Sequence, residues 1–299
     1  MLGRVARWVL APIALALATT GLVATPSSAI TGNYVPDNEH EYVGLIAFYD
    51  ASGEFLHRCS GTLLSPTVFL TAGHCVTADD ATGTLAPSAR IWFEQDAGAD
   101  YDPVTGEPAS SGYPVTGGVT ATQMYSFDYR GLTVPDTHDV GLVVLNEPVQ
   151  SVYPNINTYA DLAVPNTLDG YGSGPSARVT LSGYGLTYDR GHDQFITSYR
   201  SRLMANTWII GTGTGLAKGF SVQLASNPGR DGGGTCFGDS GGPTLLYGTD
   251  VQVAVTSFGL NPTCTGTEFN FRVDTNQVQA WMESVLQPQG LWAAVDPTA

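Results

Sequence analysis

Short runs of apolar residues, separated by turn-forming residues, recur along most of the chain. An apolar stretch of four to eight residues between turn signals is typical of a strand buried on both faces. Such runs predict strands at 42–49, 63–64, 68–70, 89–93, 140–145, 179–185, 220–225, 243–247 and 251–258. Many short strands with frequent turns favour an all-β fold.

A helical pattern occurs near the end of the chain. Apolar residues at 278, 281, 282 and 285 follow one helix face and predict a helix over 276–286. Residues 94–118 are rich in Gly, Pro, Ser and Asp and predict a long surface loop. The sequence assigns no role to the tail at 287–299.

Composition agrees with a β protein and limits the partners. Charged residues make up 13% of the 299 residues, while Gly numbers 36 and Pro 18, which suits a turn-rich fold. The length allows one large domain or two small ones. A net charge of −15 disfavours nucleic acid and anionic membrane surfaces as partners, and we interpret the acidity as a solubility feature.

Residues 1–29 have the pattern of a secretory signal peptide. Two arginines precede an apolar run from 8 to about 24, and small residues at 27–29 end it. Pro12 and the polar sequence that follows disfavour the alternative, a membrane anchor. We therefore expect a secreted, extracellular protein without membrane contact after cleavage, and the arginine–tryptophan start of the leader favours a bacterial source.

The most informative motif is CFGDSGGP at 236–243, which places Ser240 between glycines. Glycine lets the backbone turn tightly and lets a substrate approach. Such a turn aims the N–H groups of Gly238 and Ser240 into one small volume, which can hold the oxyanion of an acyl-transfer intermediate. The motif also fits the looser G-x-S-x-G of α/β-hydrolases, where the histidine follows the serine. No histidine follows Ser240, so the order His, Asp, Ser is the one available.

Two further segments supply partners for Ser240. CSGTLL at 59–64 is followed by VFLTAGHC at 68–75, which brings His74 to the end of a predicted strand. HDVGLVVL at 138–145 puts Asp139 before an apolar run typical of a buried strand. Together with GDSGGP, these segments resemble the motifs of the chymotrypsin/trypsin family of serine proteases.

The resemblance covers nearly the whole chain after the leader and implies the fold of that family. We expect an all-β protein of two six-stranded antiparallel Greek-key β-barrels packed together, with a short C-terminal helix. The implied peptidase domain covers 30–275, with a first barrel at about 30–146, a crossing at about 147–177 and a second barrel at about 178–275.

The resemblance also implies a catalytic triad. Ser240 would attack the scissile carbonyl, His74 would take and return the proton, and Asp139 would hold the imidazole in the required tautomer. The N–H groups of Gly238 and Ser240 would form the oxyanion hole, and no cofactor is expected. We interpret the remaining histidines as surface or satisfied core residues, with His138 a solvated neighbour of the site: His40, His57, His138 and His192.

Disulfides persist in exported proteins, and four cysteines allow three pairings. The resemblance favours Cys59–Cys75 and Cys236–Cys264, the second of which would brace the nucleophile loop. The alternative use of four cysteines is a zinc site. Neither pair has ligand spacing, so we expect no metal.

Cleavage after the leader would start the chain at Ile30. Members of the family begin with Ile-Val-Gly-Gly, and their new amino group inserts beside the aspartate that precedes the nucleophile, here Asp239. The resemblance thus implies that signal cleavage itself creates the activating N-terminus. The alternative is that Ile30 is simply the first exported residue.

The resemblance also locates the primary specificity pocket. Its implied lining is Gly234, Thr235, Ser257, Phe258 and Gly259. Trypsin-like members carry an aspartate where this chain has Gly234, so the usual reason to expect cleavage after Arg or Lys is missing. Glu268 falls where relatives usually carry a small residue of the pocket wall, and a carboxylate there would restore selection for basic side chains. The alternative is a surface glutamate, which would leave a pocket for aromatic or large apolar side chains.

The sequence therefore predicts a secreted, monomeric serine endopeptidase that acts on proteins or peptides, with proteinaceous inhibitors as further partners. Two other interpretations remain. A protease-like binding protein would normally have lost a triad or oxyanion residue, and none is missing. An esterase would use the same nucleophile on weaker bonds, so peptide cleavage separates it from an endopeptidase.

Overall fold

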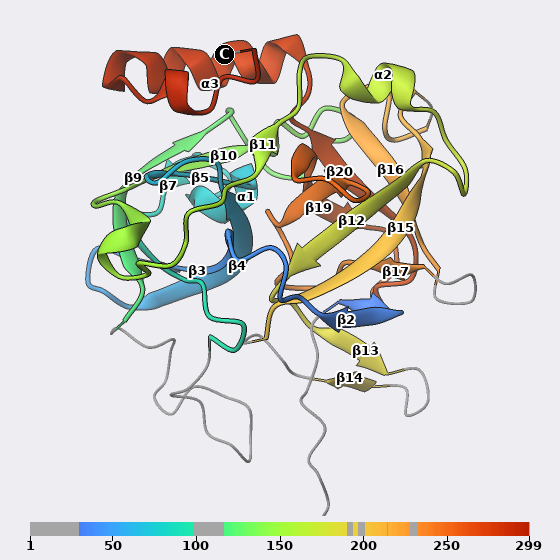
Figure 1. The fold of residues 1–299 in the computed structure, drawn as a ribbon, viewed down its shortest axis with the longest axis horizontal. Helices are drawn as coiled ribbons and strands as arrows, with labels where there is room; N and C mark the ends of the chain where they lie inside the picture. Colours follow the sequence, from blue (N-terminus) through green and yellow to red (C-terminus); the bar gives the residue numbers. More distant parts are fainter. Residues whose placement is uncertain are drawn as a thin grey trace, which may run out of the picture.

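The structure is a computed structural model of the chain, and it describes residues 30–97, 117–189, 194–196, 201–213, 215–227 and 232–298. The expected leader, most of the expected 94–118 loop and His192 lie outside these residues. Strands dominate the described part and form two barrels that lie side by side (Figure 1).

The first barrel is a closed antiparallel sheet in the order β10-β5-β4-β3-β8-β9. Its strands are β3 (Val43–Tyr49), β4 (Phe55–Leu63), β5 (Val68–Thr71), β8 (Ser88–Trp92), β9 (Val119–Ser126) and β10 (Gly141–Leu145). Every residue of β3, β5 and β10 is buried, which explains why the sequences of these strands are almost entirely apolar. Closure leaves this sheet without an exposed edge.

The second barrel contains six strands that the pairing of β19 with β20 closes into a ring. They are β12 (Arg178–Gly183), β15 (Leu203–Gly211), β16 (Ser221–Ser226), β18 (Pro243–Leu246), β19 (Val251–Gly259) and β20 (Gly266–Arg272). All pairings within this ring are antiparallel. The expected fold class of two barrels is therefore confirmed.

Short strands and helical turns complete the described part. The strand pairs are β1 (Thr31–Gly32) with β17 (Gly233–Gly234), β2 (Tyr34–Pro36) with β15, β6 (Thr77–Asp79) with β7 (Thr84–Leu85), β11 (Asp161–Leu162) with β19, and β13 (Thr187–Asp189) with β14 (Gln194–Ile196). The helical turns are α1 (Gly73–Val76), η1 (Val149–Ser151), α2 (Thr167–Tyr171), η3 (Gln287–Gln289) and η4 (Trp292–Ala294). Through β1 and β2, the start of the described chain is attached to the second barrel before the chain builds the first.

A buried polar network joins the two barrels. Arg202, directly before β15, is 2% exposed. Its Nη1 donates to Val43 O and Phe93 O, both at 3.0 Å, and its Nε donates to Asp37 O at 3.2 Å. Burial of a guanidinium requires such partners, because an unpaired buried charge is costly.

The C-terminal helix α3 spans Asn276–Leu286, as its apolar spacing predicted. It lies across one side of the first barrel (Figure 1), and Met282 and Leu286 are buried in the same hydrophobic cluster as that barrel's strands. The tail then returns to this cluster, where Val295 is buried, so 287–298 covers part of the core. No helix within the described ranges is long and apolar enough to cross a membrane.

Candidate active site

His74 and Asp139 meet at one end of the first barrel. His74 lies on α1, just beyond β5 rather than at its end as expected, and Asp139 shortly precedes β10, the partner strand of β5. Asp139 Oδ1 accepts the backbone N–H of His74 at 2.8 Å, and Asp139 Oδ2 lies 2.9 Å from His74 Nδ1. With Nδ1 bound to the carboxylate, Nε2 is the ring nitrogen left to exchange a proton.

The two residues stabilise each other's charged forms. Burial raises the pKa of Asp139, but the attraction and hydrogen bonds of His74 outweigh burial and hold that pKa below its usual value. Burial likewise opposes protonation of His74, yet the Asp139 carboxylate raises the His74 pKa above its usual value. The pair is therefore suited to receive a proton on the imidazole.

Ser257 of β19 brings the second barrel to the same carboxylate. Its hydroxyl donates to Asp139 Oδ2 at 2.5 Å, across 118 residues of sequence. The sequence placed Ser257 only in the pocket wall, because no local pattern relates residues so far apart. The hydroxyl satisfies an oxygen of the buried acid, as a buried charge requires.

Ser240 approaches from the second barrel, shortly before β18, and lines the same cavity as His74. The cavity measures about 670 Å³ and is lined by both barrels. Among the hydrogen bonds of the described residues, none joins Ser240 Oγ to His74. Such contacts are often long until substrate binds, so the two side chains still qualify as nucleophile and base.

The turn that carries Ser240 is held against β4. Ser60 N donates to Ser240 O at 2.8 Å, and Ser60 Oγ donates to Gly238 O at 2.9 Å. A Cβ on Gly241 would lie 2.0 Å from Thr71 Oγ1, so this position requires glycine. Within the described residues, the N–H groups of Gly238 and Ser240 have no acceptor, which leaves both available to a ligand oxygen.

Asp239 carries a buried carboxylate beneath this turn. Its Oδ1 accepts Gly185 N and its Oδ2 accepts Cys236 N, both at 2.8 Å. Burial raises the pKa of Asp239 to about 7, against the effect of these two bonds. No cation contacts the carboxylate among the residues that the structure describes.

Ile30 is hydrogen-bonded to the same short segment as this carboxylate. It is completely buried, and its carbonyl accepts Thr187 Oγ1 at 3.1 Å. Thr187 follows Gly185, the donor to Asp239, by only two residues. The start of the described chain and Asp239 are therefore bound to the same short segment.

Glu268 lies in the interior, 3% exposed, so the alternative of a surface glutamate is wrong. Its Oε2 accepts three hydrogen bonds, from Ser226 Oγ and Thr235 N at 2.7 Å and from Thr235 Oγ1 at 2.9 Å. Its Oε1 is buried without a hydrogen-bond partner, and burial raises the pKa of Glu268. A Cβ on Gly234 would lie 2.0 Å from Ser226 Oγ, so glycine there leaves room for the Ser226–Glu268 contact.

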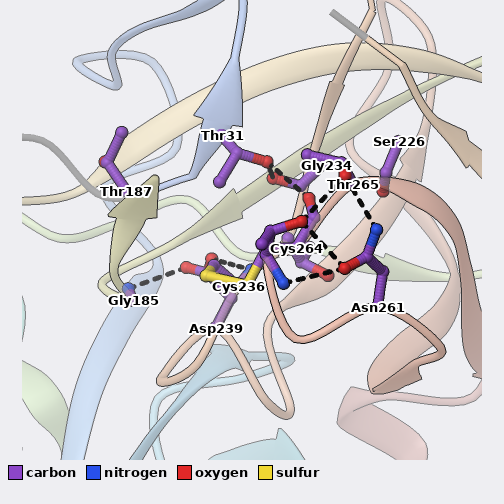
Figure 2. The surroundings of a disulfide bond; sticks show 12 residues. Thr31, Gly185, Thr187, Ser226, Gly234, Cys236, Asp239, Asn261, Cys264 and Thr265 are labelled. Atoms are coloured by element: carbon purple, nitrogen blue, oxygen red, sulfur yellow. Dashed lines mark hydrogen bonds between the residues drawn. A yellow bond between two sulfur atoms is a disulfide. The ribbon is translucent and has the colours of Figure 1, made fainter. Parts of the chain in front are cut away.

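The cysteines pair as the resemblance implied, Cys59 with Cys75 and Cys236 with Cys264. Figure 2 shows the second disulfide between two contacts: Asp239 with Gly185 on one side, and Thr31 on the other. Thr31 Oγ1 donates to Cys264 O at 2.9 Å. The nucleophile loop, the expected pocket wall and β1 are thus one connected unit.

One group of side chains has the proximity of a metal site. His74 and the sulfurs of Cys59 and Cys75 lie within 4.8 Å of one another. Cysteine binds a metal as the thiolate, however, and both sulfurs are bonded to each other in a disulfide. This group therefore has no thiolate to offer a metal.

The remaining expected pocket residues lie beside this centre. Phe258 lines the cavity and stacks on Phe269 with ring centroids 4.9 Å apart, and Gly259 pairs with Glu268 across β19 and β20.

Two other histidines, the buried His40 and the half-buried His57, have polar partners. His40 Nδ1 lies 3.0 Å from the Asp37 carboxylate, and His57 Nε2 lies 2.6 Å from Cys75 O. Both are satisfied, as the sequence interpretation expected.

His138 is 33% exposed beside Asp139, but it also has polar partners that the sequence did not reveal. Its Nδ1 lies 3.0 Å from Phe127 O, and its Nε2 lies 3.1 Å from the Asp136 carboxylate. The ring also stacks on Phe127, with centroids 4.9 Å apart. A sequence pattern could not show this, because the partners belong to a turn rather than to a regular element.

Two curated relatives are similar to this chain. CLIP domain-containing serine protease B10 of Anopheles gambiae is 25% identical over 250 residues, which cover 80% of this chain and 64% of that protein. Spaetzle-processing enzyme of Drosophila melanogaster is 29% identical over 233 residues, which cover 71% of this chain and 54% of that protein. The chain thus spans less than two thirds of the length of either relative. Both come from insects, so a bacterial source finds no support.

Solved structures share the fold. HL collagenase matches with a TM-score of 0.57 at 18% identity, over 87% of this chain and 97% of that one. The scabies mite inactivated protease paralogue S-D1 matches with a TM-score of 0.55 at 16% identity, over 86% of this chain and 96% of that one. One of these proteins is named a collagenase and the other an inactivated protease. The structural similarity therefore shows the fold of this chain and not its activity.

A model of the family described as Trypsin matches residues 30–282. That range contains both barrels, the His74–Asp139 pair, the Ser240 turn and most of α3. With the motifs, the fold and the two disulfides in agreement, the chain belongs to the trypsin family of serine proteases.

Proposed function

We propose that this chain is an active serine endopeptidase, and the Asp139–His74 pair facing Ser240 in one cavity carries the proposal. Ser240 Oγ attacks the scissile carbonyl carbon while His74 Nε2 takes the hydroxyl proton. The tetrahedral intermediate collapses, its C–N bond breaks, and His74 returns the proton to the leaving amine. Water, deprotonated by His74, then releases the acyl group and restores Ser240.

The oxyanion of each tetrahedral intermediate would bind the N–H groups of Gly238 and Ser240. Their lack of other acceptors within the described residues supports this role. Removal of one such donor typically costs about 2.7–4 kcal/mol of transition-state stabilisation. Because both donors belong to the backbone, the turn geometry rather than a side chain supplies this part of catalysis.

A peptide-library digest tests the proposal. The secreted protein and its Ser240→Ala variant are incubated with the library, and new peptide termini are identified by mass spectrometry. Cuts made only by the native protein support the endopeptidase. Hydrolysis of small esters without any peptide cuts would favour an esterase, and activity on neither substrate would favour a protease-like binding protein.

For the substrate we propose peptides with Arg or Lys before the cut bond, bound by Glu268. The Glu268 Oε1 atom has no partner, and two more buried oxygens without partners lie on the same face of the β19–β20 ladder: Thr256 Oγ1 and Asn270 Oδ1. Thr256 pairs directly with Asn270, which is two residues from Glu268. A guanidinium or an ammonium carries only donors and a positive charge, which complements these acceptors.

Glu268→Gln tests the acidic pocket because it keeps the shape and removes the charge. We expect kcat/KM for Arg and Lys substrates to fall by about 30-fold or more, since loss of one partner of a buried charge pair costs about 2–5 kcal/mol. Glu283→Gln, on the exposed side of α3, is the matched control and should leave kcat/KM unchanged. A native preference for aromatic or large apolar residues, unchanged in Glu268→Gln, would show that the pocket is not acidic.

We further propose that the chain is secreted as a monomer and activated by cleavage after Ala29. Two disulfides support export, because such bonds persist in oxidising compartments. The buried Asp239 carboxylate without a cation supports a pairing with the amino group that cleavage would create at Ile30. N-terminal sequencing of the active secreted protein tests this step, and any start other than Ile30 contradicts it. Size-exclusion chromatography of the same preparation tests the monomer.

A further inference from the structure

His138, directly before Asp139, has acceptors at both ring nitrogens. Nδ1 lies 3.0 Å from the carbonyl oxygen of Phe127, and Nε2 lies 3.1 Å from Asp136 Oδ2. A neutral imidazole has one donor nitrogen and one acceptor nitrogen, whereas the imidazolium donates from both. The imidazolium is therefore the form of the ring that satisfies both contacts.

These two contacts join the ends of the segment 127–138, which lines part of the cavity that holds His74 and Ser240. Phe127 stands at the start of the segment 127–138 and Asp136 near its end, and the His138 side chain bridges them. The ring stacks on Phe127, which in turn contacts Trp281 of α3 with centroids 5.3 Å apart. The bridge is thus anchored to the C-terminal helix.

The other charged groups around this bridge have partners of their own. Asp128 and Arg130, in the same segment, form an ion pair at 2.8 Å. Asp139, the next residue along the chain, is bound to His74. Helix α3 contributes the uncharged ring of Trp281 to the stack. Asp136 is therefore the carboxylate that faces the His138 ring.

The backbone at His138 reverses the chain just before the catalytic acid. His138 has a φ of +51°, a left-handed conformation that histidine adopts more readily than most residues. Val140 N donates to His138 O at 2.9 Å, and Phe127 N donates to Val140 O at 2.9 Å. A Cβ on Gly73 would lie 3.0 Å from His138 O, so this turn is packed against the residue before His74.

We propose that His138 is a positioning residue for Asp139, and that its imidazolium clasps Phe127 to Asp136 to fix the turn from which Asp139 reaches His74. This role rests on the proposed endopeptidase function. It goes beyond the triad, because His138 itself touches neither Ser240 nor the His74 ring in the described contacts. A loosened turn would let the carboxylate move relative to the imidazole, and misplacements of about 1 Å can cost 10²-fold in rate.

Kinetics of two variants test the clasp. His138→Ala removes both contacts and also the side chain that favours a left-handed backbone. His138→Asn still favours that backbone conformation but lacks a ring with a nitrogen for each of the two acceptors. We expect kcat for peptide hydrolysis to fall about tenfold in both variants, with KM within about twofold. Arg130→Gln, in the same segment, is the control and should leave kcat and KM unchanged.

Native kcat in His138→Asn would overturn the proposal, because the backbone conformation alone would then be sufficient. A raised KM with native kcat would also overturn it, since the loop would then act only as a wall of the cleft. Thermal midpoints of the variants are compared with that of the native protein, and rates are measured well below them.

Nitrogen-15 NMR of the ring tests the clasp without reference to activity. We expect both ring nitrogens of His138 in the full chain to carry protons, because each lies beside an acceptor oxygen. A spectrum with one unprotonated nitrogen overturns the clasp. If the protein hydrolyses no peptide, the proposed function fails while this spectrum still decides the state of His138.

Discussion

Side chains from both barrels bind the carboxylate of Asp139. Its carboxylate is completely buried and is held by His74 from the first barrel and by the Ser257 hydroxyl from the second. A carboxylate so placed stays ionised only because its donors outweigh burial. The charge in turn raises the pKa of His74.

Replacement of Asp139 by Asn should therefore change both the rate and its pH dependence. We expect kcat to fall by about 10⁴-fold, because the amide favours the wrong imidazole tautomer. The pKa of His74 should fall once the carboxylate charge is gone. Since the unprotonated imidazole is the active base, the acid limb of the residual activity should move to lower pH. Rate measurements between about pH 4 and pH 9 check both effects.

The motifs located Ser240, His74 and Asp139, the residues of the proposed triad, because each lies within a short, local pattern. They did not identify the bond from Ser257 to Asp139 or the Thr235–Glu268 contacts. Those contacts join segments far apart in sequence, and their geometry depends on how the second barrel closes. The partners of His138 were not identified for a related reason: they belong to a turn.

At the scale of elements, the Cys236–Cys264 disulfide joins the nucleophile loop to the loop before β20. Thr31 of β1 donates to the Cys264 carbonyl, so the disulfide connects β1 as well as these two loops (Figure 2). The Cys59–Cys75 disulfide instead lies within the first barrel, between β4 and α1. The two bonds should therefore differ in function more than in stability.

Double replacement by serine should lower the free energy of unfolding by about 3 kcal/mol for either pair, since loop lengths of 16 and 28 residues differ little in closure entropy. Only loss of Cys236–Cys264 should also raise KM, because that bond braces the expected pocket wall. Urea unfolding and steady-state kinetics of the two double variants check this. Equal KM values in both variants would show that the pocket wall does not depend on its disulfide.

The sequence predicted elements best where burial is uniform along them. The apolar runs located β3, β10 and β19, and the spacing of apolar residues located α3. It missed β15, whose residues alternate between buried and partly exposed, and β20, whose sequence GTEFNFR is half polar. The polar residues of β20 include Glu268 and Asn270, which are buried near the expected pocket, so the site itself obscured the strand pattern.

At the scale of the whole molecule, Arg202 connects the barrels whose interface forms the site. Replacement by Met would remove its donors from three backbone carbonyls, Asp37 O, Val43 O and Phe93 O, of which Val43 O keeps the Tyr184 hydroxyl at 3.5 Å. Each unpaired buried acceptor costs about 1–3 kcal/mol, so we expect at least about 2 kcal/mol of destabilisation. Lys218→Met, at an exposed position, should change stability by less than about 0.5 kcal/mol. Chemical unfolding of both variants checks this, and equal effects would mean that the interface does not depend on Arg202.

The proposed pairing of Asp239 with the Ile30 amino group would make stability depend on cleavage of the leader. In the uncleaved chain its pKa is raised from 3.8 to about 7 by burial. The folded state then holds a proton that the unfolded state has released, so the free energy of unfolding should decline as pH rises from about 4 to above 7. The raised pKa of Glu268 acts in the same direction, so the share of Asp239 is measured as the difference from Asp239→Asn.

Cleavage after Ala29 should remove this decline, because a cationic Ile30 amino group would stabilise the ionised carboxylate and lower its pKa. The pairing would in turn raise the amino pKa above its ordinary value of about 7.7–8.0, so stability should fall only at higher pH. Urea unfolding at about pH 5 and pH 8 compares three proteins: the uncleaved chain, its Asp239→Asn variant and the chain that starts at Ile30. A smaller loss of stability between these pH values in the cleaved than in the uncleaved chain would place the new amino group beside Asp239. An equal loss in both would mean that the amino group does not reach the carboxylate, and that Ile30 is buried for packing alone.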